Sequence, residues 1–319
     1  MIHARDLVRN FKTKTGVVEA VKGLSLDVAE GELVAFLGPN GAGKSTSVRM
    51  LTTLLPPDSG SANIGGFDIA REPEAVRKRI GYVGQGTGSG PYHRVKDELV
   101  TQGQALRMKR SAAADRADEL LQMLELDGMA DRDASSLSGG QKRRLDIALG
   151  LMHTPPILFL DEPSTGLDPH SRANLWEHIL KLRQSSGMTI FLTTHYLDEA
   201  DAMAERVMIM DGGRMIADDT PARLKANLAG DTITLTLRDT GEATRAAGIA
   251  EQTDGKRDLT VDGSRLMLVI ADGEGKLPGL VVACRDAGID VLAASVKRPT
   301  LDDVFLGLTG RSLREQAAA

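Results

Sequence analysis

A short apolar run leads directly into a glycine-rich loop near the start of this 319-residue chain. Residues 31–38 have the composition of a buried strand, and residues 45–55 have the periodicity of a helix. A strand, a tight loop and a helix in this order predict an α/β fold. The residues at the junction are Gly38-Pro39-Asn40-Gly41-Ala42-Gly43-Lys44-Ser45-Thr46.

This junction fits the phosphate-binding pattern G-x-x-x-x-G-K-[ST]. In such a P-loop the backbone N–H groups and the helix N-terminus attract phosphate oxygens. Lys44 is predicted to contact the β- and γ-phosphates, and the Ser45 hydroxyl is predicted to bind the Mg²⁺ that bridges them. A glycine-rich turn that fits the pattern by chance is the alternative, but the flanking strand and helix argue against it.

Two further apolar strands end on polar residues. Residues 157–160 precede Asp161 and Glu162, and residues 189–193 end just before His195. Open α/β sheets bind ligands at the carboxyl ends of their strands. Alone, an acidic pair is commonly only a polar strand end; beside a P-loop, Asp161 is predicted to hold Mg²⁺ through a water and Glu162 to polarise the attacking water.

A third motif, Leu137-Ser138-Gly139-Gly140-Gln141, precedes a predicted helix over residues 142–152. Its position at a helix N-terminus makes it a second anion site. With these motifs the chain resembles the ABC ATPases over about residues 1–220. The resemblance implies a P-loop NTPase cassette with a RecA-like core sheet and a helical subdomain, which binds ATP and Mg²⁺ and hydrolyses ATP.

The resemblance also implies how the motifs cooperate. Two cassettes pack head to tail as a homodimer, or as a heterodimer with a similar cassette, and each ATP lies between the P-loop of one and residues 138–141 of the other. Gln85 resembles the glutamine that touches Mg²⁺ and the attacking water, and Asp168 ends a loop that crosses the interface. His195 resembles the histidine that reads the γ-phosphate, although an isolated histidine at a strand end is more commonly an ordinary hydrogen-bonded group. The implied catalytic residues are Lys44, Gln85, Glu162 and His195.

By the same resemblance, the adenine-stacking residue lies near the start of the cassette. Phe11 is the candidate, and Val18 shares or takes that contact. The alternative for Phe11 is an ordinary core phenylalanine, because aromatic side chains are buried by default.

The patterns divide the chain into two domains. The predicted cassette spans residues 1–221, with a helical subdomain over about residues 92–150. From residue 222 to residue 319 the order of elements becomes β-α-β-β-α-β, which predicts a small α+β, ferredoxin-like accessory domain. At its end, Thr300 and Asp303 fit a helix cap. Trp176 and the single cysteine, Cys284, are predicted to be buried in the core.

Charge and hydropathy limit the partners. Lys and Arg number 39 against 44 Asp and Glu, so no basic excess favours nucleic-acid binding. No apolar run reaches the roughly 18 residues that span a bilayer, and the first residues lack a signal-peptide pattern, so a cytoplasmic chain is expected. The resemblance implies a separate membrane permease, whose short helices enter a groove beside Gln85, and a location at the cytoplasmic face of the membrane. The glycine-rich segment 86–91 after Gln85 is predicted to be a hinge or a surface loop.

Residues 300–310 resemble the end of the ATPases of the daunorubicin/doxorubicin-resistance type. This second resemblance implies an exporter of a drug or antibiotic. Export of a lipid or polysaccharide would require the same catalytic residues and stays open. Two further alternatives are an ABC ATPase that acts on ribosomes or DNA, and a small-molecule kinase in which residues 138–141 are only a loop.

Overall fold

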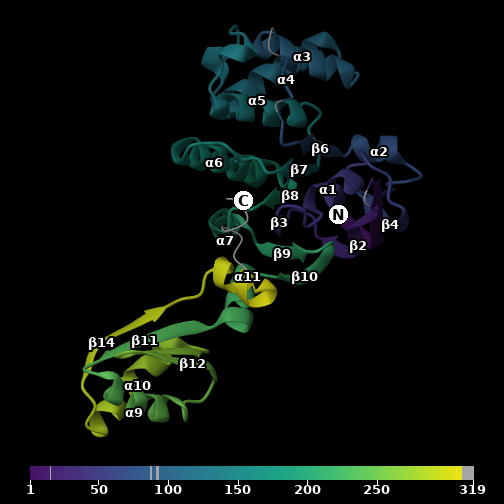
Figure 1. Ribbon diagram of the computed structural model, residues 1–319. Coiled ribbons are helices and arrows are strands. Elements are labelled where there is room, and N and C mark those ends of the chain that lie inside the picture. The colour runs from purple at the N-terminus through teal and green to yellow at the C-terminus, as the bar shows by residue number, and fades with distance from the viewer. Residues whose placement is uncertain (15, 87, 91–92, 311–319) are drawn as a thin grey trace. The chain divides into compact units, whose positions relative to one another are not determined.

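The computed structural model describes residues 1–14, 16–86, 88–90 and 93–310 (Figure 1). The chain divides into two compact units, Met1–Asp218 and Asp219–Ala319. In the described part of the chain, no helix is both long enough and apolar enough to cross a membrane.

A six-stranded sheet, ordered β10-β9-β3-β8-β7-β6, forms the centre of the first unit. Its neighbouring strands pair in parallel from β9 through β6. The side chains of β3, β7 and β8 are buried along their whole length, as expected for parallel strands covered on both faces. The α/β fold is confirmed, and the three predicted strands are neighbours whose carboxyl ends meet at one edge. The strands are β3 (Leu33–Leu37), β6 (Ile80–Val83), β7 (Ile157–Asp161), β8 (Thr189–Thr194), β9 (Arg206–Asp211) and β10 (Arg214–Asp219).

A second, antiparallel sheet was not predicted from the sequence. Its order is β2-β1-β4-β5, and it shares one core with the parallel sheet, in which Ile2 and Leu7 meet Phe36 and Phe191. The ring centroids of Phe36 and Phe191 lie 5.4 Å apart. Its strands are β1 (Ile2–Thr13), β2 (Gly16–Val28), β4 (Ser59–Ile64) and β5 (Phe67–Asp68).

A helical insert separates β6 from β7, as predicted. Figure 1 shows α3, α4 and α5 gathered in one group. Tyr92, with which the insert was predicted to begin, lies outside the described residues. The insert comprises α3 (Val95–Ala105), α4 (Arg110–Met123), η1 (Asp127–Met129), η2 (Ala134–Ser136) and α5 (Gly139–Leu151).

Four more helices belong to the first unit. Trp176 on α6 is 2% exposed, which confirms that it is a core residue. The helices are α1 (Lys44–Leu51), α2 (Pro73–Arg77), α6 (Pro169–Ser186) and α7 (Leu197–Met203).

The second unit has the predicted ferredoxin-like topology. Its strands are ordered β12-β13-β11-β14 and pair antiparallel, and α9 and α10 supply core residues against the same face. Cys284 is fully buried in this core, and burial raises the pKa of its thiol. The elements are α8 (Pro221–Leu224), η3 (Lys225–Ala229), β11 (Asp231–Leu237), α9 (Thr240–Ala250), β12 (Lys256–Asp262), β13 (Arg265–Ile270), α10 (Gly273–Asp286), β14 (Val291–Lys297) and α11 (Leu301–Thr309).

The cap predicted at Thr300 begins α11. The Thr300 hydroxyl accepts a hydrogen bond from the backbone N–H of Asp303 (3.2 Å), and the Asp303 carboxylate accepts one from the backbone N–H of Thr300 (2.8 Å). This reciprocal pair is a capping box. The acidic residue therefore serves the helix start, as predicted.

Gly43 lies where the phosphate loop passes close to β2. Its φ is +106°, and a Cβ atom there would lie 2.3 Å from the carbonyl oxygen of Ala20. We expect Gly43→Ala to destabilise the first unit by about 1–3 kcal/mol, because backbone must move to relieve that contact. Urea unfolding without nucleotide would measure this. Gly41→Ala is the matched control, because Gly41 also has positive φ (+79°) but a Cβ would meet nothing within 4 Å. Equal midpoints for the two variants would contradict the steric argument.

Candidate functional site

The loop between β3 and α1 surrounds the Lys44 ammonium. Lys44 is 5% exposed, and its Nζ donates hydrogen bonds to the carbonyl oxygens of Gly38 (2.6 Å) and Pro39 (3.1 Å). Burial lowers the pKa of Lys44, and the carboxylates of Glu162 and Asp161 oppose that change. The amine is therefore held at the loop as a positive centre, within the electrostatic field of both acids.

Oxygen-bearing side chains gather where α1 faces the ends of β7 and β8. The Ser45 hydroxyl donates to Asp161 Oδ1 (3.2 Å), and the Gln85 amide donates to Ser45 Oγ (3.1 Å). Thr193 Oγ1 also donates to Asp161 Oδ1 (2.6 Å). Mg²⁺ prefers hydroxyl, carboxylate and phosphate oxygens, commonly with one or two carboxylates from the protein. The donor set of Ser45, Gln85 and Asp161 fits such an ion.

Glu162 follows the strand end in an unusual backbone conformation. Its φ is +50°, which costs about 1–3 kcal/mol for a residue other than glycine. Its backbone N–H donates to the carbonyl (3.1 Å) and the hydroxyl (3.0 Å) of Thr193, which hold the turn in place. These two hydrogen bonds maintain the strained backbone and so fix where the Glu162 side chain begins, next to Asp161.

His195 and Thr165 contact the Glu162 carboxylate. His195 Nδ1 lies 3.3 Å from Glu162 Oε2, near enough for an ion pair although poorly aligned for a hydrogen bond. The Thr165 hydroxyl donates to the same oxygen (3.2 Å). The contact with His195 holds the pKa of Glu162 below its usual range, although burial opposes this change. The charge of Lys44 lowers the pKa of Glu162 further. The carboxylate is thus available as a hydrogen-bond acceptor at neutral pH.

A cavity of about 380 Å³ opens beside the phosphate loop. Phe11 and Val18 lie opposite each other across β1 and β2, and both line it. Phe11 is 37% exposed, so the alternative that it is a core residue is wrong. The lining residues are Phe11, Val18, Ala20, Pro39, Asn40, Gly41, Ala42, Gly43, Lys44, Ser45, Thr46, Gln85 and Glu162.

The predicted second anion site, residues 138–141, lies apart from this cavity, as does Asp168. Ser138 is the N-cap of α5 and forms a capping box with Gln141, while Asp168 is the N-cap of α6 and accepts from the backbone N–H of Ser171 (3.0 Å). A Cβ on Gly140 would lie 3.0 Å from the Ser171 side chain, so the two helix starts approach closely. None of residues 138–141 and 168 lines the cavity beside the phosphate loop. The structure therefore separates the predicted site residues into two groups.

Three contributors to the first group were missed from the sequence. Thr193 bonds Asp161 from inside a buried strand, and Arg143 donates to the carbonyl oxygen of Asp161 (3.2 Å). Glu199, 3% exposed, accepts from the hydroxyls of Ser164 (2.9 Å) and Thr194 (3.2 Å). A threonine near the end of an apolar strand was a usable signal for Thr193. Arg143 and Glu199 stand in helices rich in charge, so sequence alone did not distinguish them.

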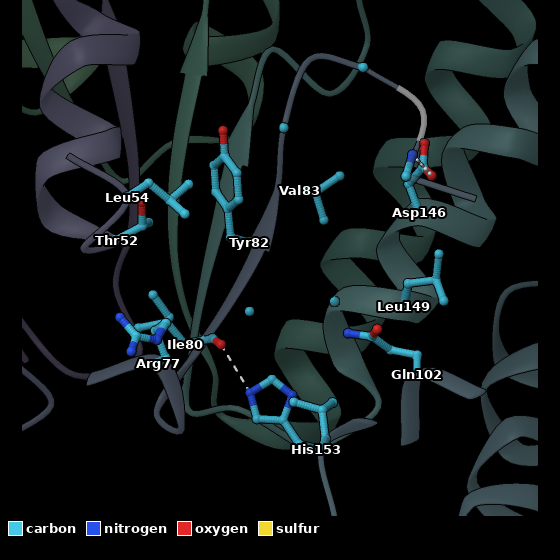
Figure 2. Close-up of a pocket in the computed structure, with 16 residues that line it drawn as sticks. Thr52, Leu54, Arg77, Ile80, Tyr82, Val83, Gln102, Asp146, Leu149 and His153 are labelled. Carbon is cyan, nitrogen blue, oxygen red and sulfur yellow. Dashed lines mark hydrogen bonds between the residues drawn. The ribbon is translucent and has the colours of Figure 1, made fainter. Parts of the chain in front are cut away.

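A second cavity, of about 370 Å³, lies between β6 and the helical insert (Figure 2). Figure 2 shows Val83 on the side of Asp146 and Leu149 of α5, while Tyr82 lies on the side of Thr52 and Leu54. His153 closes one end, where its Nε2 lies 2.9 Å from the carbonyl oxygen of Ile80. Thr87 and Pro91 of the glycine-rich segment 86–91 lie outside the described residues, while Gly86 and Gly88 line this cavity. The cavity is thus an apolar groove with a few polar groups, directly beyond Gln85.

Comparison with known proteins places this geometry in a family. The family model described as ABC transporter matches residues 21–165. A daunorubicin resistance ATP-binding protein of Streptomyces coeruleorubidus is 42% identical over 314 residues, which cover 98% of each chain. A linearmycin resistance ATP-binding protein of Bacillus subtilis is 36% identical and covers 99% of this chain and 100% of its own.

A solved structure is similar over the first unit. It is the dimeric structure of a post-hydrolysis state of an ATP-binding cassette with ADP and Pi, with a TM-score of 0.64 and 27% identity over 69% of this chain and 98% of its own. The relatives are similar in sequence over nearly the whole chain. The solved structure is similar over the cassette. The chain therefore belongs to the ABC transporter family, as an ATP-binding and ATP-hydrolysing subunit.

Proposed function

We propose that this chain drives the export of a drug or antibiotic through a separate membrane permease. The observation that carries ATP hydrolysis, the part of this proposal that the chain itself performs, is the cavity in which Phe11, Lys44, Ser45, Gln85 and Glu162 meet. It offers an aromatic surface for a base, a cation for phosphates and a carboxylate. These are the groups that binding and hydrolysis of ATP require.

Within that cavity, each residue has a proposed role. Phe11, with Val18 beside it, stacks on adenine, while the loop amides and Lys44 bind the phosphates. Glu162 accepts a hydrogen bond from the attacking water, and His195 holds that carboxylate in place and contacts the γ-phosphate. Catalysis then depends mainly on positioning and on charge stabilisation.

Magnesium is proposed as the accompanying ion. Ser45, Gln85 and Asp161 would hold it, with Asp161 acting through a water. When bound, Mg²⁺ neutralises charge on the β- and γ-phosphate oxygens. The hydroxyl of Thr193 supports this arrangement, because it restrains the Asp161 carboxylate from the neighbouring strand.

The second group of residues is proposed to complete the site of a partner cassette. Ser138, Gly139, Gly140 and Gln141 surround the start of α5, where helix amides and dipole favour an anion. Because these residues do not line this chain's own nucleotide cavity, a head-to-tail dimer would use both surfaces. ATP then holds two cassettes together, and hydrolysis releases them.

The groove between β6 and α5 is proposed to receive a short helix of the permease. It lies directly after Gln85, so a helix seated there is close to a residue that contacts the nucleotide cavity. This docking would place the chain at the cytoplasmic face of the membrane, where ATP is available. No nucleic acid is proposed as a partner.

Similar proteins that are named for drug resistance support the proposal that the transported cargo is a drug. The relatives at 42% and 36% identity are named for daunorubicin and linearmycin resistance. A Nod factor export ATP-binding protein of Burkholderia lata is 34% identical over 96% of this chain. Drug export is therefore the better-supported choice over other cargo.

A docking variant tests this proposal. Leu149 lines the groove, so we expect Leu149→Glu to abolish co-purification with a co-expressed membrane permease, because a buried charge opposes docking. ATPase of the isolated protein should be retained. Met123→Glu is the control, since Met123 is 40% exposed on α4 and does not line the groove. Two results would contradict export as the function. One is a wild-type protein that does not bind membranes and sediments with ribosomes or DNA. The other is an ATPase rate of the assembled transporter that a hydrophobic drug leaves unchanged.

A further inference from the structure

Two side chains of α5 form hydrogen bonds with the backbone before and after Gln85. Arg143 Nη1 donates to the carbonyl oxygen of Gly84 (2.6 Å), and Asp146 Oδ1 accepts from the backbone N–H of Gly88 (2.8 Å). Arg143 and Asp146 are three residues apart and therefore project from the same face of the helix. Figure 2 shows Asp146 directed from α5 toward the segment that follows β6.

Arg143 also reaches two further segments. Its Nε donates to the carbonyl oxygen of Pro163 (2.7 Å) and its Nη2 to that of Asp161 (3.2 Å). Arg143 is 7% exposed, and Asp146 Oδ2 lies 3.9 Å from Nη1. One buried guanidinium thus joins α5 to the residue before Gln85 and to the turn that carries Asp161 and Glu162. Such a fork of donors cannot be reproduced by lysine, which carries its charge at a single point.

The same helix begins at the second phosphate-binding surface. Ser138 is the N-cap of α5, and Arg143 is about one turn further along. Because a helix moves as a rigid element, a displacement of its N-terminus is transmitted to the carbonyl oxygens that Arg143 holds. Gln85 in turn donates to Ser45 Oγ beside the phosphate loop. The rigid helix, the hydrogen bond of Arg143 to Gly84, the peptide bond from Gly84 to Gln85 and the hydrogen bond of Gln85 to Ser45 therefore connect one phosphate surface to the other.

We infer that Arg143 and Asp146 are positioning residues that set the place of Gln85 according to the position of α5. Through them, contact of residues 138–141 with one nucleotide adjusts Gln85 at the other site. The inference rests on the proposed function, because Gln85 matters to turnover only if this cavity hydrolyses ATP. It adds two residues, outside both nucleotide surfaces, that act on the reaction through Gln85.

The test is steady-state ATPase kinetics of the full chain. We expect Arg143→Gln and Arg143→Lys to lower kcat by about tenfold or more while the KM for ATP changes little, because misplacement of a positioning group affects the reaction more than binding. Asp146→Leu should lower kcat in the same way. Asp146→Asn keeps an oxygen that accepts from Gly88 and should retain most of the activity.

The combined effect of two substitutions on kcat distinguishes an action through Gln85 from a general loss of structure. In a Gln85→Ala background, Arg143→Gln should lower kcat little further, because the group that it positions is absent. Arg116→Gln is the matched control: it removes an arginine bond to the carbonyl oxygen of Leu151 (3.3 Å) within the insert and should leave kcat unchanged.

Three outcomes would overturn the inference. These are full additivity of Arg143→Gln with Gln85→Ala, equal losses for Arg143→Gln and Arg116→Gln, and a loss confined to KM. If Arg143→Gln does not fold, Asp146→Leu against Asp146→Asn decides, and equal kcat in that pair overturns it. A wild-type chain without ATPase activity would instead defeat the proposed function itself.

Discussion

Replacement of Glu162 by glutamine is expected to lower the rate of ATP hydrolysis by about 10²–10⁴-fold and to leave ATP binding intact. The two side chains have nearly the same shape, but an amide is a poor acceptor for a proton from water. In the native protein, the contacts with His195 and Lys44 favour the ionised carboxylate. The substitution therefore removes the group that orients the attacking water and keeps the cavity.

The oligomeric state in the presence of ATP distinguishes the Glu162→Gln variant from a misfolded protein. Because ATP is retained and not hydrolysed, Glu162→Gln should elute as a dimer in the presence of ATP, while wild type returns to monomer as ATP is consumed. Phosphate release and size-exclusion chromatography measure the two effects. Glu177→Gln on the exposed side of α6 is the control. Hydrolysis by Glu162→Gln at the wild-type rate would exclude the assigned role.

Replacement of Lys44 by alanine is expected to weaken ATP binding by about 100-fold or more. The ammonium is buried beneath the phosphate loop, and charged hydrogen bonds to phosphate oxygens contribute about 1.5–3 kcal/mol each. The variant also leaves the carbonyl oxygens of Gly38 and Pro39 without their donor, so the loop loses an internal restraint. Binding and hydrolysis should fail together.

Isothermal titration with ATP and Mg²⁺ measures that loss. Lys181→Ala is the control, because Lys181 is exposed on α6 and pairs with Glu177 along the helix (2.7 Å). The two active-site variants should differ in kind: Glu162→Gln keeps affinity and loses turnover, whereas Lys44→Ala loses affinity. Wild-type affinity in Lys44→Ala would show that the loop amides alone bind the phosphates.

The sequence predicted the parts of the fold whose residues are buried on both sides. The strands β3, β7 and β8 are continuous apolar runs, and such runs stand out in a sequence. The strands β1 and β2 were not predicted, because their pairing contains register shifts and many of their side chains are exposed. Strand alternation in β11 and β13 was regular, so the topology of the second unit was predicted correctly.

The functional residues could be predicted where they lie next to one another in the sequence. The phosphate loop and the pair Asp161–Glu162 are contiguous, so their residue types reveal them. The bonds of Arg143 reach 18 to 59 residues away, and the bond of Thr193 to Asp161 spans 32. Such contacts depend on the packing of strands and helices, which one sequence does not display. The backbone strain at Glu162 was likewise visible only in the structure.

The close approach of Gly140 to Ser171 makes the start of α5 a natural pivot for the helical insert. Gly140 lets the start of α5 lie close against Ser171, so a rotation of α5 about that contact would carry Arg143 with it and would displace the other end of the helix the most. That end carries Leu149 and Gly150, which line the groove of Figure 2. If α5 turns about that contact, a small tilt at residues 138–140 produces a larger displacement at Leu149 and Gly150, where the groove is proposed to receive a helix of the permease.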